Sequence, residues 1–177
     1  MQTSLIEKWL NFDLIHRVRA NHALEHATFH VLAEKGARQA MMGYSDAGGF
    51  WVAGDIPEEM LAECAKEALA RLQGGEAKLA IHEGCGTNLT VSGTIVGGLV
   101  WLGMLGAGSG FRRKLERLPL AILLGTAGLA AAQALGPKIQ QQITTLPGAP
   151  NLRLVGIRRY KVGDWVFQRV STCRVGE

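Results

Sequence analysis

The sequence is poor in the residues that build several common types of functional site. It has three cysteines, which are odd in number, far apart and without a CxxC pair. A disulfide framework and a zinc ribbon are therefore excluded. Its five histidines are too few for the histidine-rich sites of membrane desaturases and hydroxylases. Phosphate-binding loops of the P-loop type and GxSxG nucleophile motifs are absent as well.

Charge is missing from two long segments, residues 91–110 and 118–136. As a helix, the twenty residues of the first segment have a length of roughly 30 Å, the thickness of the bilayer hydrocarbon. The cationic run between the segments, FRRKLER, is expected to be a short loop, and Pro137 closes the second segment. Residues 91–137 are therefore predicted to form a two-helix transmembrane hairpin, with the lipid bilayer as partner. A buried hairpin of a soluble core is the alternative.

The first apolar segment contains seven glycines. They would weaken a soluble helix, but small residues let membrane helices approach closely. Gly93 and Gly97 have the GxxxG spacing that is typical of such contacts. The Gly-rich helices are therefore expected to pack on a second copy of the chain or in a larger membrane complex.

A secretory signal is not found at the N-terminus, because Glu7 and Asp13 interrupt the required order of positive and apolar residues. This absence and the unpaired cysteines favour cytoplasmic ends at the inner membrane, whereas the four cations of FRRKLER favour a cytoplasmic loop. The side of the soluble part stays open, with a weak preference for the cytoplasm. No basic run is interleaved with aromatic residues, so nucleic acid is not expected as a partner.

Three helices are expected outside the apolar hairpin. Residues 4–12 are predicted to form a short amphipathic helix. Asp13 is the expected N-cap of a second helix, which continues to about residue 35. Residues 55–75 form the third, with Pro57 in its first turn.

Strand patterns occur on both sides of the apolar hairpin. Residues 37–55 are predicted to form a β-hairpin around the turn DAGG. AKLAIH is expected to form a third strand, and residues 152–174 to form a hairpin around KVGD. The expected fold class is α+β: a small sheet with two packed helices, built from both ends of the chain, plus the transmembrane hairpin. The predicted parts are an N-terminal α+β part over 1–90, the hairpin over 91–137 and a C-terminal part over 138–177.

The stretch NHALEHATFH, residues 21–30, suggests a chemistry. His22 and His26 are four residues apart, so on a helix they lie one turn above the other and can share one metal ion. Glu25 precedes the second histidine, which makes the order HxxEH, the inverted form of the zinc-protease motif. In such a site the histidines bind Zn²⁺ and the glutamate accepts a proton from the metal-bound water. The alternative is a helix whose polar residues bond to the adjoining sheet or face water.

The third ligand is expected from the turn EGCGTN, where Cys85 lies between two glycines. His82 and Glu83 are the neighbouring alternatives. His30 is eight residues from His22, a helix rise of roughly 12 Å, which sets it aside for the same ion. A carboxylate from the helix over 55–75 also stays open, with these candidates: Glu58, Glu59, Glu63 and Glu67. Cys64 is interpreted as a small core residue.

The run NHALEHAT, followed by GCGTN just before two apolar segments, resembles an uncharacterised family of bacterial membrane proteins, classed as a domain of unknown function. The resemblance covers the chain from about residue 13 onward. It implies a small integral membrane protein with a signature formed by His22, Glu25, His26, Cys85 and Asn88. It implies no established activity. The similarity to inverted zinc proteases is confined to HxxEH.

Two functions follow from these features. The first is a membrane-anchored zinc hydrolase, a peptidase in which His22, His26 and Cys85 hold the metal and Glu25 is the general base. The second is a non-enzymatic membrane accessory protein in which the His/Cys site joins the helix to the turn, with or without metal.

Overall fold

The computed structural model describes residues 12–37, 41–149 and 151–175. The chain divides into two compact units: Met1–His82 with Gln141–Glu177, called the α+β unit below, and Glu83–Gln140, called the helical unit. The helix expected over residues 4–12 falls almost entirely on residues 1–11, outside the described part of the chain.

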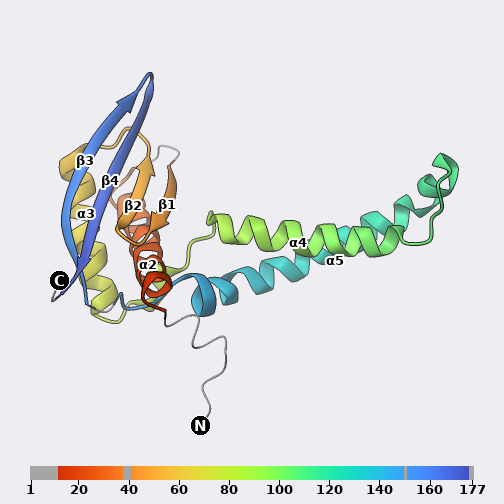
Figure 1. Cartoon of the computed structure of the whole chain (residues 1–177), viewed down its shortest axis with the longest axis horizontal. Helices are drawn as coiled ribbons and strands as arrows, with labels where there is room; N and C mark the ends of the chain where they lie inside the picture. The colour runs from red at the N-terminus through yellow and green to blue at the C-terminus, as the bar shows by residue number, and fades with distance from the viewer. Residues whose placement is uncertain (1–11, 38–40, 150, 176–177) are drawn as a thin grey trace, which may run out of the picture. The chain divides into compact units, whose positions relative to one another are not determined.

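The α+β unit contains a four-stranded antiparallel sheet in the order β1-β2-β4-β3 (Figure 1). The hairpin of β1 (Met42–Asp46) and β2 (Gly49–Ala53) confirms the one expected around DAGG. The hairpin of β3 (Leu152–Val162) and β4 (Trp165–Arg174) confirms the one expected around KVGD. Pairing of β2 with β4 joins the two ends of the chain in one sheet, as an α+β fold built from both ends requires.

Buried and more exposed side chains alternate along β2 and β4, so one face of the sheet is turned toward the core. On β2, Phe50 and Val52 are fully buried, and on β4 Val170 is buried beside them. The helix α2 (Asp13–Glu34) packs on β1 and β2 and contributes Leu24 and several alanines to the same core. Because alanine side chains are short, α2 lies close to the sheet and its polar residues come within reach of strand and loop backbone.

The helix α3 (Glu58–Gln73) packs against α2 and β3. Its N-cap is Pro57, and Glu58 and Glu59 lie in the first turn, where the positive end of the helix dipole favours acids. Cys64 lies fully buried in its apolar stripe, and this burial raises the pKa of the thiol. The interpretation of Cys64 as a core residue is confirmed.

Two local predictions for this unit are wrong. AKLAIH does not form a strand, because Ala77–Ala80 is a single 3₁₀ turn that buries Leu79 and Ala80 against α2 without a β partner. Asp13 is also not the N-cap of α2. Phe12 takes that position, and Asp13 lies in the first turn, where its carboxylate accepts a hydrogen bond from Arg174 of β4.

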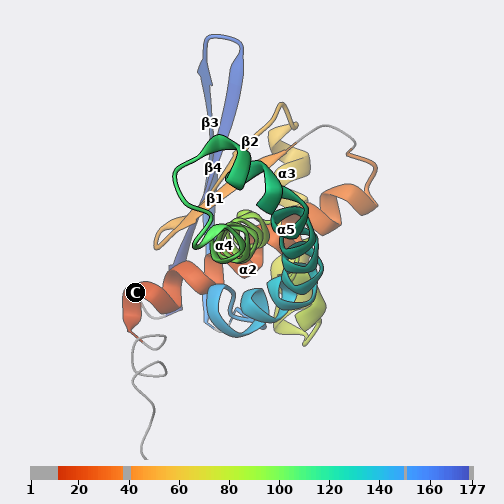
Figure 2. The same cartoon turned by 90° about the vertical axis from the view of Figure 1, so that its right-hand side faces the viewer.

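The helical unit consists of α4 (Gly86–Met104) and α5 (Phe111–Ile139), which lie side by side (Figure 2). Glycines of α5 permit the contact: a Cβ on Gly125 would meet Val100 at 3.2 Å, and one on Gly128 would meet Leu99 at 3.1 Å. Gly93 and Gly97 have no neighbour within 4 Å of an added Cβ. The GxxxG pair is therefore not used in the contact between α4 and α5.

The prediction that FRRKLER is a loop is wrong, because α5 begins at Phe111 and includes the whole run. Arg112 pairs with Glu116 one turn later at 3.3 Å, which supports a helix at this charged segment. The connection between the helices is residues 105–110, where Gly106 and Gly108 have positive φ angles. At its other end α5 continues into one π-helical turn, Gln140–Thr144.

Two membrane spans were expected, and one helix has the length and composition that a span requires. Among the described residues, only Phe111–Thr144, with a mean hydropathy of 1.8 over its most apolar stretch, is long and apolar enough to cross a membrane. The shorter α4 begins with polar residues, Thr87, Asn88 and Thr90, within its first turns. A transmembrane hairpin made of both helices therefore stays a prediction.

Candidate metal centre

The histidines of the HxxEH stretch lie on the buried part of α2. His26 is 1% exposed and His22 is half-buried, and their ring centroids are 4.3 Å apart. The helix therefore brings the two rings together edge to face, one turn apart, as a spacing of four residues predicts.

Backbone carbonyls fix the orientation of both rings. The Nδ1–H of His22 donates to the carbonyl of Thr144 at 2.9 Å, and the Nδ1–H of His26 donates to the carbonyl of Ala80 at 2.7 Å. Because a carbonyl only accepts, the proton of each neutral ring must be on Nδ1 and the lone pair on Nε2. Metal-binding histidines almost always have this kind of support, with the second ring nitrogen bonded to a carbonyl or carboxylate.

Cys85 occupies the N-cap of α4. Its side chain is 8% exposed, and its sulfur accepts a hydrogen bond from the backbone N–H of Thr87 at 3.4 Å. This N–H and the positive end of the helix dipole both stabilise a negative charge on the sulfur. The thiolate is the form of cysteine that binds metals.

Together, His22, His26 and Cys85 form a group that could hold a metal ion, because each offers one ligand atom and these atoms all lie within 4.8 Å of one another. Around a tetrahedral zinc, ligand atoms at about 2.0–2.3 Å from the metal are roughly 3.3–3.7 Å apart. That these three residues bind a metal stays a prediction.

The alternative third ligands do not join this group. Glu83 is exposed, as are Glu58, Glu59 and Glu63 on α3, and Glu67 forms an ion pair with Lys35 at 2.9 Å. His82 packs its ring against His26 and His30, with centroids at 5.7 and 5.2 Å. His30 bonds to the carbonyl of Ile81 through Nε2, at 2.8 Å, the nitrogen opposite to the one that His22 and His26 use.

Glu25, the predicted general base, is directed toward strand β1. Its Oε2 accepts a hydrogen bond from Ser45 Oγ at 2.5 Å, and a Cβ added to Gly43 would come within 2.0 Å of its Oε1. Glu25 is 5% exposed and is not part of the His/Cys group. Its catalytic role stays a prediction.

Two structural residues of α2 were not predicted from the sequence. Asn21 is fully buried, donates to the carbonyl of Asp46 at 2.8 Å and accepts from Thr172 at 2.7 Å, so it joins α2 to β1 and β4. Arg19 donates to the carbonyls of Gln142 and Thr145, both at 3.0 Å, and burial lowers the pKa of its guanidinium. Their partners are far away in the sequence, so no local pattern could have identified them.

Comparison with known proteins matches residues 17–157 to a domain of unknown function, DUF6391. The chain belongs to this family. The DUF6391 match includes most of α2 with its HxxEH stretch and both helices of the helical unit. It also includes the turn EGCGTN around Cys85, called the cysteine turn below. It confirms the resemblance to an uncharacterised family.

A curated relative of the DUF6391 chain is an uncharacterised protein of Picosynechococcus sp. (strain ATCC 27264 / PCC 7002 / PR-6). The two are 35% identical over 147 residues, which cover 72% of this chain and 65% of the relative. The chain thus spans less than two thirds of the length of that relative. No solved structure matches the chain.

Proposed function

We propose that this DUF6391 chain is a membrane-anchored zinc hydrolase with its metal on His22, His26 and Cys85. The observation that carries the proposal is the pair of carbonyl-bonded Nδ1 atoms, because it prepares the Nε2 atoms of both histidines for metal binding. Two imidazoles and one thiolate are ligands that zinc prefers among the common metals.

Among the residues that the structure describes, three candidate ligands lie together, and this number favours catalysis over a purely structural zinc. Structural sites have four protein ligands, whereas three protein ligands leave one position for water or substrate. A zinc ion bound there would lower the pKa of its water to about 7. Glu25, next to His26 on the same helix, is the residue that would accept the proton, and Ser45 holds its carboxylate in one orientation. A peptide is the substrate class that the HxxEH order favours.

A second function is favoured by the contact between Glu25 and β1. The hydrogen bond to Ser45 and the close approach of Gly43 let the carboxylate fasten α2 to the sheet. If this is its whole role, the chain is a non-enzymatic membrane accessory protein, and the His/Cys site joins the helix to the cysteine turn.

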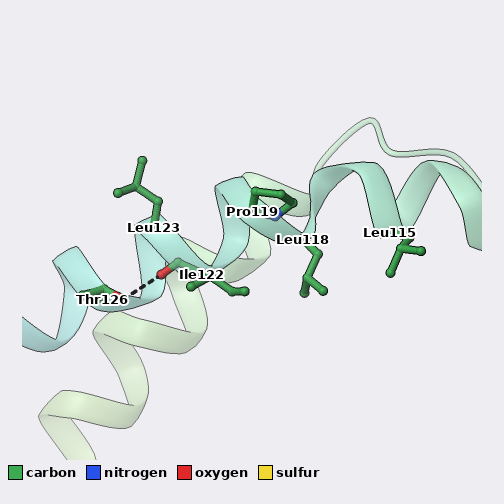
Figure 3. Close-up of a pocket in the computed structure, with 6 residues that line it drawn as sticks. All are labelled: Leu115, Leu118, Pro119, Ile122, Leu123 and Thr126. Carbon is green, nitrogen blue, oxygen red and sulfur yellow. Dashed lines mark hydrogen bonds between the residues drawn. The ribbon is translucent and has the colours of Figure 1, made fainter.

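The membrane part of the proposal is supported by α5. Leu118, Ile122 and Leu123 are 46%, 60% and 65% exposed, an unusual amount of apolar surface for one helix in water. Figure 3 shows them lining an open apolar groove of α5 with Thr126, whose hydroxyl donates within the helix to the carbonyl of Ile122 at 2.9 Å. This internal bond suits a polar side chain in lipid. We place the chain in the inner membrane, with α4 beside α5 as a second span and the exposed Gly93 and Gly97 available to a further helix.

Metal content tests the site. The full chain is purified in detergent without added metal, and zinc is measured by mass spectrometry in wild type, His22→Ala, His26→Ala and Cys85→Ser. We expect about one zinc per wild-type chain and little in the three variants, because each loses one of three ligands. His30→Ala is the matched control and should retain the metal. Wild type without zinc, or equal zinc in all variants, would contradict the proposal.

Hydrolysis separates the two functions. Glu25→Gln keeps the size of the side chain and should keep zinc, but it cannot accept the proton. Cleavage of a fluorogenic peptide library should fall by about 10²–10⁴-fold relative to wild type. Unchanged cleavage would remove Glu25 from the mechanism. A zinc-loaded wild type that cleaves none of the peptides would favour the accessory protein.

A further inference from the structure

Asn88, in the first turn of α4, has hydrogen bonds at both ends of its side-chain amide. Its Nδ2 donates to the carbonyl of Glu83 at 2.9 Å, and its Oδ1 accepts from Nε2 of Gln140 at 2.7 Å. The first bond closes the turn before α4, and the second ties this turn to the end of α5. An aspartate could make only one of the two bonds, because it has no N–H to donate.

Gln140, the partner of Asn88, also needs this hydrogen bond. Gln140 is fully buried, and a buried amide costs free energy unless it is hydrogen-bonded. Gly136, one turn earlier on α5, completes the arrangement, because a Cβ there would come within 2.4 Å of Asn88 Oδ1. Only glycine at position 136 leaves the Asn88 amide where it is.

Cys85 lies inside the segment that these bonds fix. The Asn88 side chain is bonded to the backbone of Glu83, on one side of the cysteine, and the Asn88 N–H donates to the carbonyl of Cys85 itself at 2.9 Å. The N–H of Thr87 then reaches the sulfur. The position and direction of the thiol therefore depend on a turn whose closing bonds come from Asn88.

We propose that Asn88 is the positioning residue of Cys85, and that Gln140 and Gly136 serve to hold Asn88. The inference rests on the proposed function, in which Cys85 is a ligand, and adds why the cysteine turn needs its asparagine. The same π-helical turn, Gln140–Thr144, provides the partner of Asn88 at its start and the carbonyl bonded to His22 at its end.

The test compares wild type with Asn88→Asp in two measurements on the full detergent-solubilised chain. The first is the rate at which iodoacetamide alkylates Cys85 in metal-free protein, followed on the Cys85 peptide by mass spectrometry. The second is Co²⁺ titration, with the thiolate-to-cobalt absorption as the signature of Cys85 ligation. In the variant we expect a changed alkylation rate, by about tenfold, and Co²⁺ affinity weaker by about 10–100-fold with that absorption lost or reduced.

Gly136→Ala is the second variant, in case the charge of Asn88→Asp prevents folding. It should shift both readouts in the same direction, because its methyl group displaces the Asn88 amide. Gly125→Ala is the matched control on the same helix, since its Cβ would touch only valine side chains of α4. It should leave the alkylation rate and the cobalt spectrum as in wild type, even if it changes thermal stability.

The outcomes distinguish the two proposals. If both Asn88→Asp and Gly136→Ala keep the wild-type alkylation rate and cobalt absorption, Asn88 does not position Cys85, whatever happens to the melting temperature. If wild type binds no cobalt, the metal function fails, and the alkylation rates still decide whether Asn88 controls the thiol. A wild-type cobalt spectrum without thiolate absorption removes Cys85 from the proposed ligands, and the alkylation rates again decide whether Asn88 positions the thiol.

Discussion

At the scale of single residues, the two nitrogens of each imidazole distinguish the candidate ligands, His22 and His26, from His30. His22 and His26 use Nδ1 for a backbone carbonyl, whereas His30 uses Nε2. The HxxEH spacing predicted the pair and helix rise set His30 aside. The carbonyl partners could not be predicted, because Ala80 and Thr144 are 54 and 122 residues away from their histidines in the chain.

At low pH, the hydrogen-bonded ion pair between Asp46 and Arg169 should lose its contribution to stability. Arg169 donates to both carboxylate oxygens, at 2.8 and 2.6 Å, and these hydrogen bonds hold the pKa of Asp46 below its ordinary value of 3.8. A carboxyl with a lowered folded pKa stabilises the fold above its unfolded pKa, and this contribution is lost as pH falls through the folded pKa. Urea unfolding of wild type should therefore show stability falling below about pH 4, and Asp46→Asn should flatten that fall. Asp164→Asn, an exposed carboxylate between β3 and β4, is the control. If the stability of Asp46→Asn fell with pH as steeply as that of wild type, the lowered pKa of Asp46 would be contradicted.

At the scale of elements, α2 and β1 are held together by a contact that needs a glycine in the strand. Glycine weakens a strand, and it often marks a close approach of another group. Here Gly43 faces the carboxylate of Glu25, and Ser45, two residues on and on the same side of β1, donates to it. The sequence predicted β1 and α2 but not their contact, because the strand pattern does not reveal what lies against each face.

Gly43→Ala tests this contact. Its Cβ would come within 2.0 Å of Glu25 Oε1, so the carboxylate or the strand must move. We expect a loss of about 1–3 kcal/mol in the free energy of unfolding, measured with urea, as for other overpacked sites. Gly156→Ala on β3 is the matched control, since nothing lies within 4 Å of its added Cβ. Equal stability of the two variants would show that the contact between Glu25 and β1 is loose.

At the scale of the whole molecule, the chain combines a compact α+β unit with a helical unit whose exposed side chains are largely apolar. In the α+β unit the apolar side chains face the core. On α5 the small residues face α4 and many large ones are exposed, which is the reverse of a soluble helical hairpin. This distribution supports the bilayer as the partner of the helical unit.

Membrane extraction tests the prediction for the whole chain. Wild type should stay in the membrane pellet after alkaline carbonate treatment. Leu123→Arg places a charge in the middle of α5, which costs about 2.5–3.5 kcal/mol at a helix centre during insertion, so a larger fraction should be released or degraded. Ala70→Arg, on the exposed side of α3, should be retained like wild type. Release of the wild type by carbonate would exclude an integral membrane protein.

The sequence by itself determined the features that depend on neighbouring residues. Periodicity and turn residues predicted both β-hairpins and the helices α2 and α3, and the absence of charge marked α5. Spacing along one helix selected His22 and His26. These signals are local, because strand alternation and helix pitch repeat within a few residues.

Only the tertiary structure decided the rest. It replaced a predicted strand by a 3₁₀ turn, extended α5 through the charged run FRRKLER, and directed Glu25 toward β1. It also brought Gln140 to Asn88 across 52 residues of chain. Glu25 and Gln140 are buried polar residues, and their partners come from other segments that meet them only when the chain is folded.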